Sequence, residues 1–203
     1  MVINDTYKFL FVHIQKTAGI SIRESLKEIK DTKNFYYPHY MINLVEEDLS
    51  EYFKFCFVRN PWDRLVSWYN MMQEKKIHND FSEYILKNSN TFSEFLDLTD
   101  IIMEKNDEGK LEGLDYPKSI SFNQLDYITD SDGIINVDFI GRFENINEDF
   151  KKVMKILQIK DNVLPHLNKF EHKPYRDYYK NKKDVEKVAL MYKKDIEYFN
   201  YEF

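Results

Sequence analysis

The sequence predicts an α/β fold with a central, mainly parallel sheet flanked by helices. Three apolar runs have the composition of buried strands: residues 7–14, 52–58 and 137–141. Each run is followed by a segment whose apolar residues recur with helical spacing. Strands that alternate with helices are typical of a parallel sheet covered by helices. Because ligands in such sheets bind beyond the carboxyl ends of the strands, the residues after each run are candidates for a site.

Size and composition indicate a single globular domain over residues 1–203. The chain has 203 residues, of which 43% are hydrophobic, enough for a sizeable core. No apolar stretch approaches the roughly 20 residues of a membrane span, and no signal-peptide pattern is visible at the start. Cys56 is the single cysteine, so it is expected to be a small buried residue rather than part of an internal disulfide. We therefore expect a cytoplasmic protein.

Capping signals mark the starts of two expected helices. Asn60 and Pro61 supply a cap and a favoured first helical residue directly after the second strand. Thr91 and Glu94 have the spacing of a capping box. Together with the apolar stripes, these signals predict helices at 20–30, from residue 61, from residue 91, after residue 141 and at about 183–198, and a loop at 106–119.

The charge distribution limits the classes of partner. A net charge of −6 argues against the broad basic surface that an extended nucleic-acid footprint needs. Residues 166–183, in contrast, contain six Lys and Arg against two acidic residues. This segment fits either a solvated surface or a contact for one anionic ligand.

The turn after the first predicted strand, within FVHIQKTAGISIRESL (11–26), has the chemistry of an anion site. A strand-to-helix turn gathers unpaired N–H groups at the positive end of the helix dipole. Gly19 allows close approach of the backbone, Lys16 adds a positive charge, and Thr17 and Ser21 add hydroxyl groups. The Lys-[Ser/Thr] step by which an ATP loop holds magnesium is missing. Taken alone, the turn fits either an anion cradle or a plain connection.

The second strand end, within FVRNPWDRLVSWY (57–69), adds an arginine and a serine. Arg59 follows the strand and would be a permanently charged fork near the same sheet edge. Ser67 lies two turns into the next helix, as a small donor pointing back. Asn60 and Pro61 could instead be no more than a helix entry, but a charge at the end of a buried strand needs a partner.

These two stretches together resemble the motifs of sulfotransferases. FVHIQKTAGISI is similar to their 5′-phosphosulfate loop, and FVRNPWDRLVSWY is similar to their 3′-phosphate motif. The likeness is closest to the carbohydrate branch that includes heparan sulfate 2-O-sulfotransferase and its small bacterial relatives. It continues in the expected order through VDFIGRFENINEDFKKV (137–153) and LPHLNKFEHKPYRDYY (164–179). Two departures are Gln15, where proline is usual, and Ile20, where threonine is common.

The resemblance implies a P-loop-like three-layer domain that moves a sulfuryl group from 3′-phosphoadenosine 5′-phosphosulfate (PAPS) to a hydroxyl. The acceptor is expected to be a carbohydrate. A sulfuryl group carries less charge than a γ-phosphoryl group, so no metal is expected, and this accounts for the missing magnesium step. The residues implied are Lys16 and the amides of Thr17, Ala18, Gly19, Ile20 and Ser21 for the 5′-phosphosulfate, Arg59 and Ser67 for the 3′-phosphate, Phe143 for adenine, and Lys169 in a closing loop. For Phe143, a core position is an equally good interpretation.

The transfer also needs a general base, and the chain has five histidines. His39, in FYYPHYM (35–41), lies between the two phosphate motifs, where carbohydrate sulfotransferases place their catalytic histidine. His13 is expected in the core or beside the site, His78 on a polar surface, and His166 and His172 in the C-terminal loop. His39 is therefore the predicted base, while Lys16 would neutralise charge that develops on the leaving-group oxygen.

Two other functions are compatible with parts of the pattern. A P-loop kinase would use ATP and magnesium, which the missing Lys-[Ser/Thr] step and the Arg59/Ser67 pair disfavour. A non-catalytic nucleotide-binding module would keep Lys16 and Arg59 but would not require His39.

TDSDGIIN (129–136) has the composition of a calcium loop, but its spacing indicates a turn. Zinc and serine-hydrolase motifs are missing, and residues 78–132 are expected to shape the acceptor pocket.

Overall fold

The computed structural model describes residues 1–36, 39–73, 80–107, 120–160, 164 and 173–203. By its internal contacts the chain forms two compact units. The first comprises residues 1–59 and 124–169, and the second comprises residues 60–123 and 170–203. That the two units act as a single domain stays a prediction.

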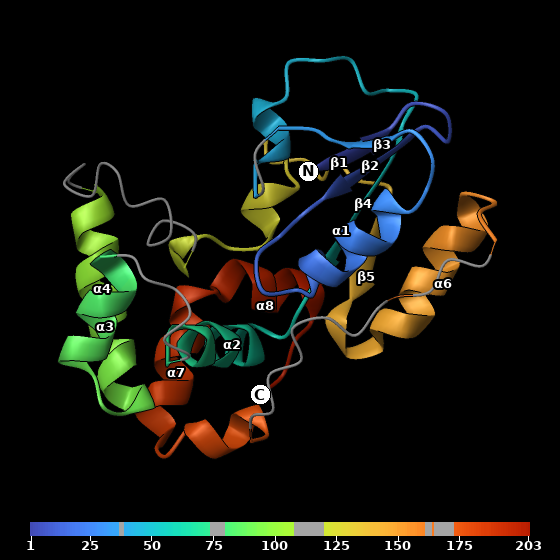
Figure 1. Ribbon diagram of the computed structural model, residues 1–203. Coiled ribbons are helices and arrows are strands. Elements are labelled where there is room, and N and C mark those ends of the chain that lie inside the picture. Colours follow the sequence, from blue (N-terminus) through green and yellow to red (C-terminus); the bar gives the residue numbers. More distant parts are fainter. Residues whose placement is uncertain (37–38, 74–79, 108–119, 161–163, 165–172) are drawn as a thin grey trace. The chain divides into compact units, whose positions relative to one another are not determined.

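The first unit is built on one five-stranded sheet in the order β3-β1-β2-β4-β5 (Figure 1). β2 pairs with β4 and β4 pairs with β5 in parallel, whereas β1 is antiparallel to both of its neighbours. The predicted α/β class with a mainly parallel centre is confirmed. The strands are β1 (Val2–Asn4), β2 (Phe9–Val12), β3 (Thr32–Asn34), β4 (Phe53–Val58) and β5 (Phe139–Arg142).

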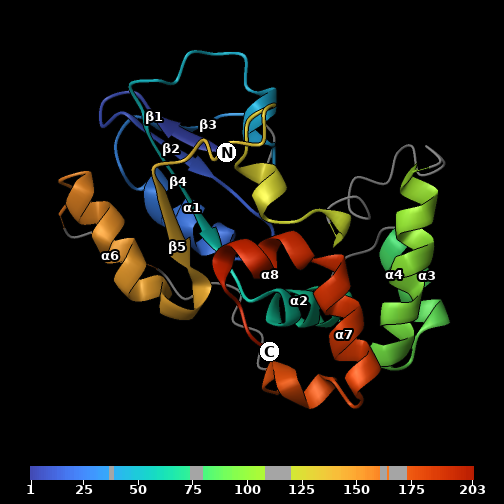
Figure 2. The same ribbon diagram turned by 180° about the vertical axis from the view of Figure 1, so that it is seen from behind.

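Two helices cover one face of this sheet, as Figures 1 and 2 show from opposite sides. They are α1 (Gly19–Lys27) and α6 (Ile146–Ile156). Their apolar residues pack with the alternate strand residues that point to the same face, because side chains along a strand alternate between faces. The cluster contains Phe9 and Phe11 of β2, Phe55 and Phe57 of β4, Ile22 and Leu26 of α1, and Phe150 and Val153 of α6. On the opposite face, Leu10 and Val12 of β2 and Cys56 and Val58 of β4 are also fully buried.

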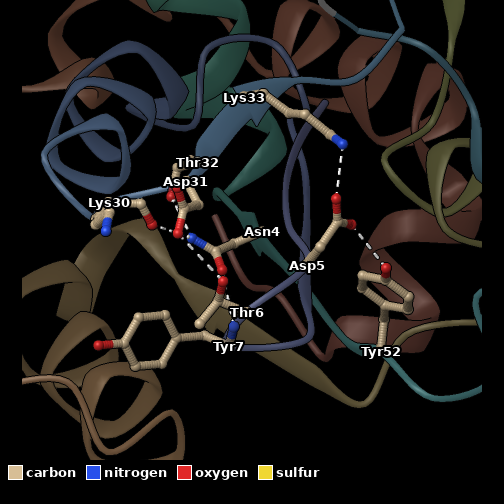
Figure 3. A network of polar contacts seen from close by, with 9 residues as sticks. All are labelled: Asn4, Asp5, Thr6, Tyr7, Lys30, Asp31, Thr32, Lys33 and Tyr52. Atoms are coloured by element: carbon tan, nitrogen blue, oxygen red, sulfur yellow. Dashed lines mark hydrogen bonds and ion pairs between the residues drawn. The ribbon is translucent and has the colours of Figure 1, made fainter.

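The two short strands β1 and β3 were not predicted. β3 has the sequence TKN, which carries no apolar signal, and β1 is three residues long. Polar side chains at this edge hold the strands in place (Figure 3). Buried Asn4 donates to the Lys30 carbonyl at 2.9 Å and to the Thr32 hydroxyl at 2.8 Å, and Asp5 accepts from Lys33 and Tyr52. The register of β1 with β3 is thus set partly by side-chain hydrogen bonds.

The second unit is helical. Its described elements are α2 (Pro61–Gln73), α3 (Asp80–Asn88), α4 (Phe92–Asp107), the short η4 turn (Tyr175–Tyr178), α7 (Lys182–Met191) and α8 (Lys193–Phe199). α4 begins one residue after Thr91, as its capping box predicts: the Thr91 hydroxyl accepts from the Glu94 N–H, and the Glu94 carboxylate accepts from the Thr91 N–H. Of the loop predicted at 106–119, the first two residues end α4, and the rest lies outside the described residues.

The single helix predicted at about 183–198 is wrong, because the structure divides it at Tyr192. This residue has φ −113° and ψ 34°, which are not helical angles, and it separates α7 from α8. Its ring is fully buried, its hydroxyl donates to the Ile120 carbonyl at 2.6 Å, and the Arg64 guanidinium lies 5.5 Å from the ring centroid. Tertiary packing of one tyrosine thus interrupts a segment whose apolar spacing is continuous.

Candidate functional site

The loop between β2 and α1 has a backbone shape suited to anions. Lys16 and Ala18 both have left-handed conformations, with φ 67° and 63°, and Ala18 is the residue that precedes α1. Alternation of left-handed and ordinary residues turns successive N–H groups toward one concave side. The first N–H groups of a helix have no acceptor within the helix and form its positive end. The loop therefore combines two sources of positive potential in its backbone alone.

Internal contacts hold this loop in shape. The buried Thr17 hydroxyl donates to the Ile14 carbonyl at 2.9 Å, so its proton is engaged inside the loop, and Thr17 can serve an anion through its N–H. Gly19 is required by a close approach, since a Cβ on this residue would overlap the His13 ring. Ser21 is buried in the first turn of α1, and Lys16 is half-buried.

Arg59 lies beside the loop between β2 and α1, in the first unit. The parallel register pairs Val58 of β4 with Arg142 of β5, so the residues that follow these strands, Arg59 and Phe143, come side by side. Only 5% of Arg59 is exposed. Its Nη1 donates to the Lys16 carbonyl at 3.2 Å, and its guanidinium lies 4.0 Å from the Phe143 ring centroid. The structure thus brings together Lys16, Arg59 and Phe143 from three segments.

Gln124 fixes the backbone of Arg59. The Arg59 N–H donates to Gln124 Oε1 at 2.8 Å, and Gln124 Nε2 donates to the Arg59 carbonyl at 2.9 Å. The amide side chain therefore satisfies both backbone groups just beyond the end of β4. Gln124 is fully buried and lies 65 positions away in the sequence. No local sequence pattern marks Gln124 as a functional residue, because its partner is so distant in the chain.

His39 lies against His13 in the same unit. The two ring centroids are 4.3 Å apart, and Nδ1 of His39 is 3.2 Å from the main-chain oxygen of His13. Because a carbonyl oxygen can only accept, Nδ1 carries the hydrogen in this contact, and the neutral ring presents Nε2 as its unprotonated nitrogen. Tyr36 and Tyr40, which precede and follow His39 in the chain, stack on each other with ring centroids 4.5 Å apart.

The buried position of His13 determines its protonation. Only 3% of His13 is exposed, and this burial lowers its pKa well below the usual 6.5, with a smaller lowering by the neighbouring His39. His13 is therefore neutral near pH 7 and cannot readily take up a proton. Of the two histidines, His39 has the tautomer and the partial exposure that a general base needs.

Comparison with known proteins assigns the chain to a family. A model of the sulfotransferase family matches residues 1–202. The chain belongs to this family. The sulfotransferase is also 30% identical over 141 residues to an uncharacterized protein of Archaeoglobus fulgidus, an alignment that covers 68% of the chain and 97% of that relative. A search of the solved structures gives no match. Membership of the family indicates transfer of a sulfuryl group to a hydroxyl-bearing acceptor.

For the other predicted site residues of the sulfotransferase, the structure gives no more than local surroundings, and their roles stay predictions. Ser67 is 6% exposed on α2, in the second unit, and its role beside Arg59 stays a prediction. Lys169, and the alternative histidines His78, His166 and His172, lie outside the described residues. Ile20 is 43% exposed at the start of α1.

The stretch 129–136 is a turn, as predicted: Asp130 Oδ1 accepts from the Asp132 and Ile134 N–H groups. Among the described residues, no group of three or more His, Cys, Asp and Glu side chains could hold a metal ion. Within the same part of the chain, no helix has the length and apolar character that crossing a membrane requires.

Proposed function

We propose that this sulfotransferase transfers a sulfuryl group from PAPS to a hydroxyl group of a carbohydrate. The observation that carries the nucleotide assignment is the buried Arg59 guanidinium, oriented by the Lys16 carbonyl and the Phe143 ring beside the anion loop. The first unit thus offers two different anion-binding elements, a loop of N–H groups and a fixed cation. A nucleotide with one anionic group at its 5′ position and another at its 3′ position matches such a pair.

The residues that would hold the nucleotide follow from the resemblance, and the contacts among Lys16, Arg59 and Phe143 support part of this set. Lys16 and the N–H groups of residues 17–21 would hold the 5′-phosphosulfate, and Arg59, together with Ser67, would hold the 3′-phosphate. The contact of Phe143 with Arg59 supports a position beside the nucleotide, where its ring would pack on adenine. Lys169 would close over the bound nucleotide.

The chemistry of the transfer would fall on two side chains. When bound, PAPS supplies an activated sulfuryl group with a phosphate as its leaving group. The Lys16 ammonium would neutralise the charge that develops on the leaving oxygen. Nε2 of His39 would accept the proton of the acceptor hydroxyl, since Nδ1 donates to the His13 carbonyl. As in phosphoryl transfer, positioning and charge stabilisation would supply most of the rate enhancement.

The nucleotide assignment can be tested by calorimetry without an acceptor. Adenosine 3′,5′-bisphosphate (PAP), the product of PAPS, should bind with micromolar affinity, a binding free energy of about −8 kcal/mol. Adenosine 5′-monophosphate should bind much more weakly, because it lacks the 3′-phosphate for Arg59. The PAP titration should be unchanged by EDTA. Equal affinity for the two nucleotides, or a need for magnesium, would contradict the proposal and favour a kinase.

The carbohydrate acceptor rests on the resemblance to the carbohydrate branch, and a transfer assay tests it separately. The assay uses PAPS with a radiolabelled sulfuryl group and two matched panels of acceptors, one of poly- and oligosaccharides and one of phenols and aliphatic alcohols. Label transferred to the saccharide panel alone supports the proposal. Transfer to the second panel alone would keep the sulfotransferase assignment and overturn the acceptor class.

A further inference from the structure

The ring of His13 lies between the anion loop and His39. His13 directly follows β2, and its ring stacks on Phe11 with centroids 5.8 Å apart and an interplanar angle of 18°. The His39 ring lies 4.3 Å away at an angle of 57°. On another edge, a Cβ built on Gly19 would overlap Cδ2 and Nε2 of His13. One buried ring therefore touches both the first residue of α1 and the candidate base.

The His13 ring contacts its described neighbours by packing, and not through a hydrogen bond or a charge. Nδ1 of His13 is buried and has no hydrogen-bond partner among the described residues. The ring is also neutral, because burial lowers its pKa well below the usual value. A neutral, closely packed ring does not compete with His39 for a proton. Its size, however, sets how closely His39 and the start of α1 can approach, because packed interiors deform little.

We propose that His13 is a positioning residue that holds His39 at a fixed place relative to the N-terminus of α1. The ring packs between Gly19 and His39, while the main-chain oxygen of His13 accepts the Nδ1 hydrogen of His39. This inference rests on the proposed function, since it takes His39 as the base and the loop as the donor site. A change of shape at Gly19 should then be transmitted to His39 through the ring.

A double-mutant cycle tests this transmission without any acceptor. The four proteins are the wild type, Gly19→Ala, His13→Ala and the double variant, and the readout is the ¹H–¹⁵N NMR spectrum of the His39 ring. Gly19→Ala alone should displace the His13 ring, shift the His39 resonances and lower Tm. In the His13→Ala background, the added methyl group enters the space left by the ring, so Gly19→Ala should change neither quantity. Equal effects of Gly19→Ala in both backgrounds would overturn the proposal.

Kinetics supply the second readout. His13→Ala should lower kcat about tenfold or more, because a small misplacement of a catalytic group is costly, and should leave the Kd for PAP within about threefold. His13→Phe restores a ring and should recover most of kcat. Phe9→Leu is the matched control: Phe9 lies on the same face of β2 and is fully buried, so this change should lower Tm with kcat unchanged.

The outcomes separate this inference from the proposed function. If His13→Ala turns over as fast as Phe9→Leu, or if His13→Phe is as slow as His13→Ala, then His13 does not position the base. If the wild type neither binds PAP nor transfers label, the proposed function fails instead. The NMR cycle then still decides whether the His13 ring couples Gly19 to His39.

Discussion

At the scale of single residues, the candidate site contains side chains that other residues of the first unit hold in place. Arg59 is oriented at its backbone by Gln124 and at its guanidinium by Lys16 and Phe143. The sequence could single out Lys16, Arg59 and His39 as candidates, because their residue types occur at strand ends or in motif order. It could not predict Gln124, or the contact of His13 with Gly19, because these depend on the register of segments that are distant in sequence.

Arg59→Ala should weaken PAP binding by roughly 2–4 kcal/mol, since a phosphate would lose a buried, charge-assisted partner. Adenosine 5′-phosphosulfate lacks the 3′-phosphate, so its affinity should change little. Calorimetry with both ligands measures the difference, and Lys27→Ala, which removes an exposed charge from α1, controls for net charge. Equal losses for the two ligands would mean that Arg59 acts by supporting the loop through the Lys16 carbonyl.

His39→Ala should lower turnover by a factor of about 10²–10⁴, the usual contribution of a general base. Its affinity for PAP should be almost unchanged, because the imidazole is assigned to the acceptor. The measurement is the initial rate with radiolabelled PAPS and a saccharide identified in the acceptor screen, on protein whose circular dichroism matches the wild type. A rate within a few-fold of the wild type would assign the proton transfer to another group and leave His39 a packing role beside His13.

At the scale of elements, apolar runs and capping signals predicted β2, β4, β5, α1, α2, α4 and α6. The signal was weakest where an element depends on its neighbours. β3 is polar in sequence and forms because β1 pairs with it. The helix breaks at Tyr192 because the buried side chain of this residue donates a hydrogen bond to the Ile120 carbonyl. Periodicity measures which face of an element is buried, but it does not report a hydrogen bond from another segment.

Thr91→Ala should lower the free energy of unfolding by about 1 kcal/mol, because it removes the acceptor for the Glu94 N–H at the start of α4. Urea denaturation measures this change. Thr91→Ser keeps the hydroxyl and should behave nearly as the wild type does. If the alanine and serine variants prove equally stable, the capping hydrogen bond contributes nothing measurable to stability.

At the scale of the whole molecule, the chain passes from one unit to the other at residues 59/60, 123/124 and 169/170. Arg59 is bonded to Gln124 within the first unit, and Arg64 Nη1 donates to the Phe122 carbonyl at 3.1 Å within the second. Each unit therefore brings together the two ends of the segment between residues 59 and 124. Because closing a loop costs entropy, folding of either unit lowers that cost for the other.

The two units carry separate natural probes, which makes their coupling measurable. Trp62 and Trp68, the two tryptophans of the chain, lie buried on α2 in the second unit, and Cys56, its single cysteine, lies buried on β4 in the first. Burial also raises the pKa of the Cys56 thiol, so it should react only after unfolding. If the chain is one domain, tryptophan fluorescence and thiol labelling should give the same urea midpoint. Separate midpoints would show two domains.

The left-handed backbone of Ala18 has a consequence for chirality. An L-alanine with φ 63° and ψ 19° places its Cβ unfavourably, at a cost of roughly 1 kcal/mol, whereas the mirror-image amino acid prefers these angles. D-Alanine introduced at position 18 by chemical ligation should therefore raise the stability of the protein while leaving the N–H groups of the loop in place. At position 18 of the anion loop, a D-amino acid would therefore fit the backbone conformation at least as well as the L-alanine that is present.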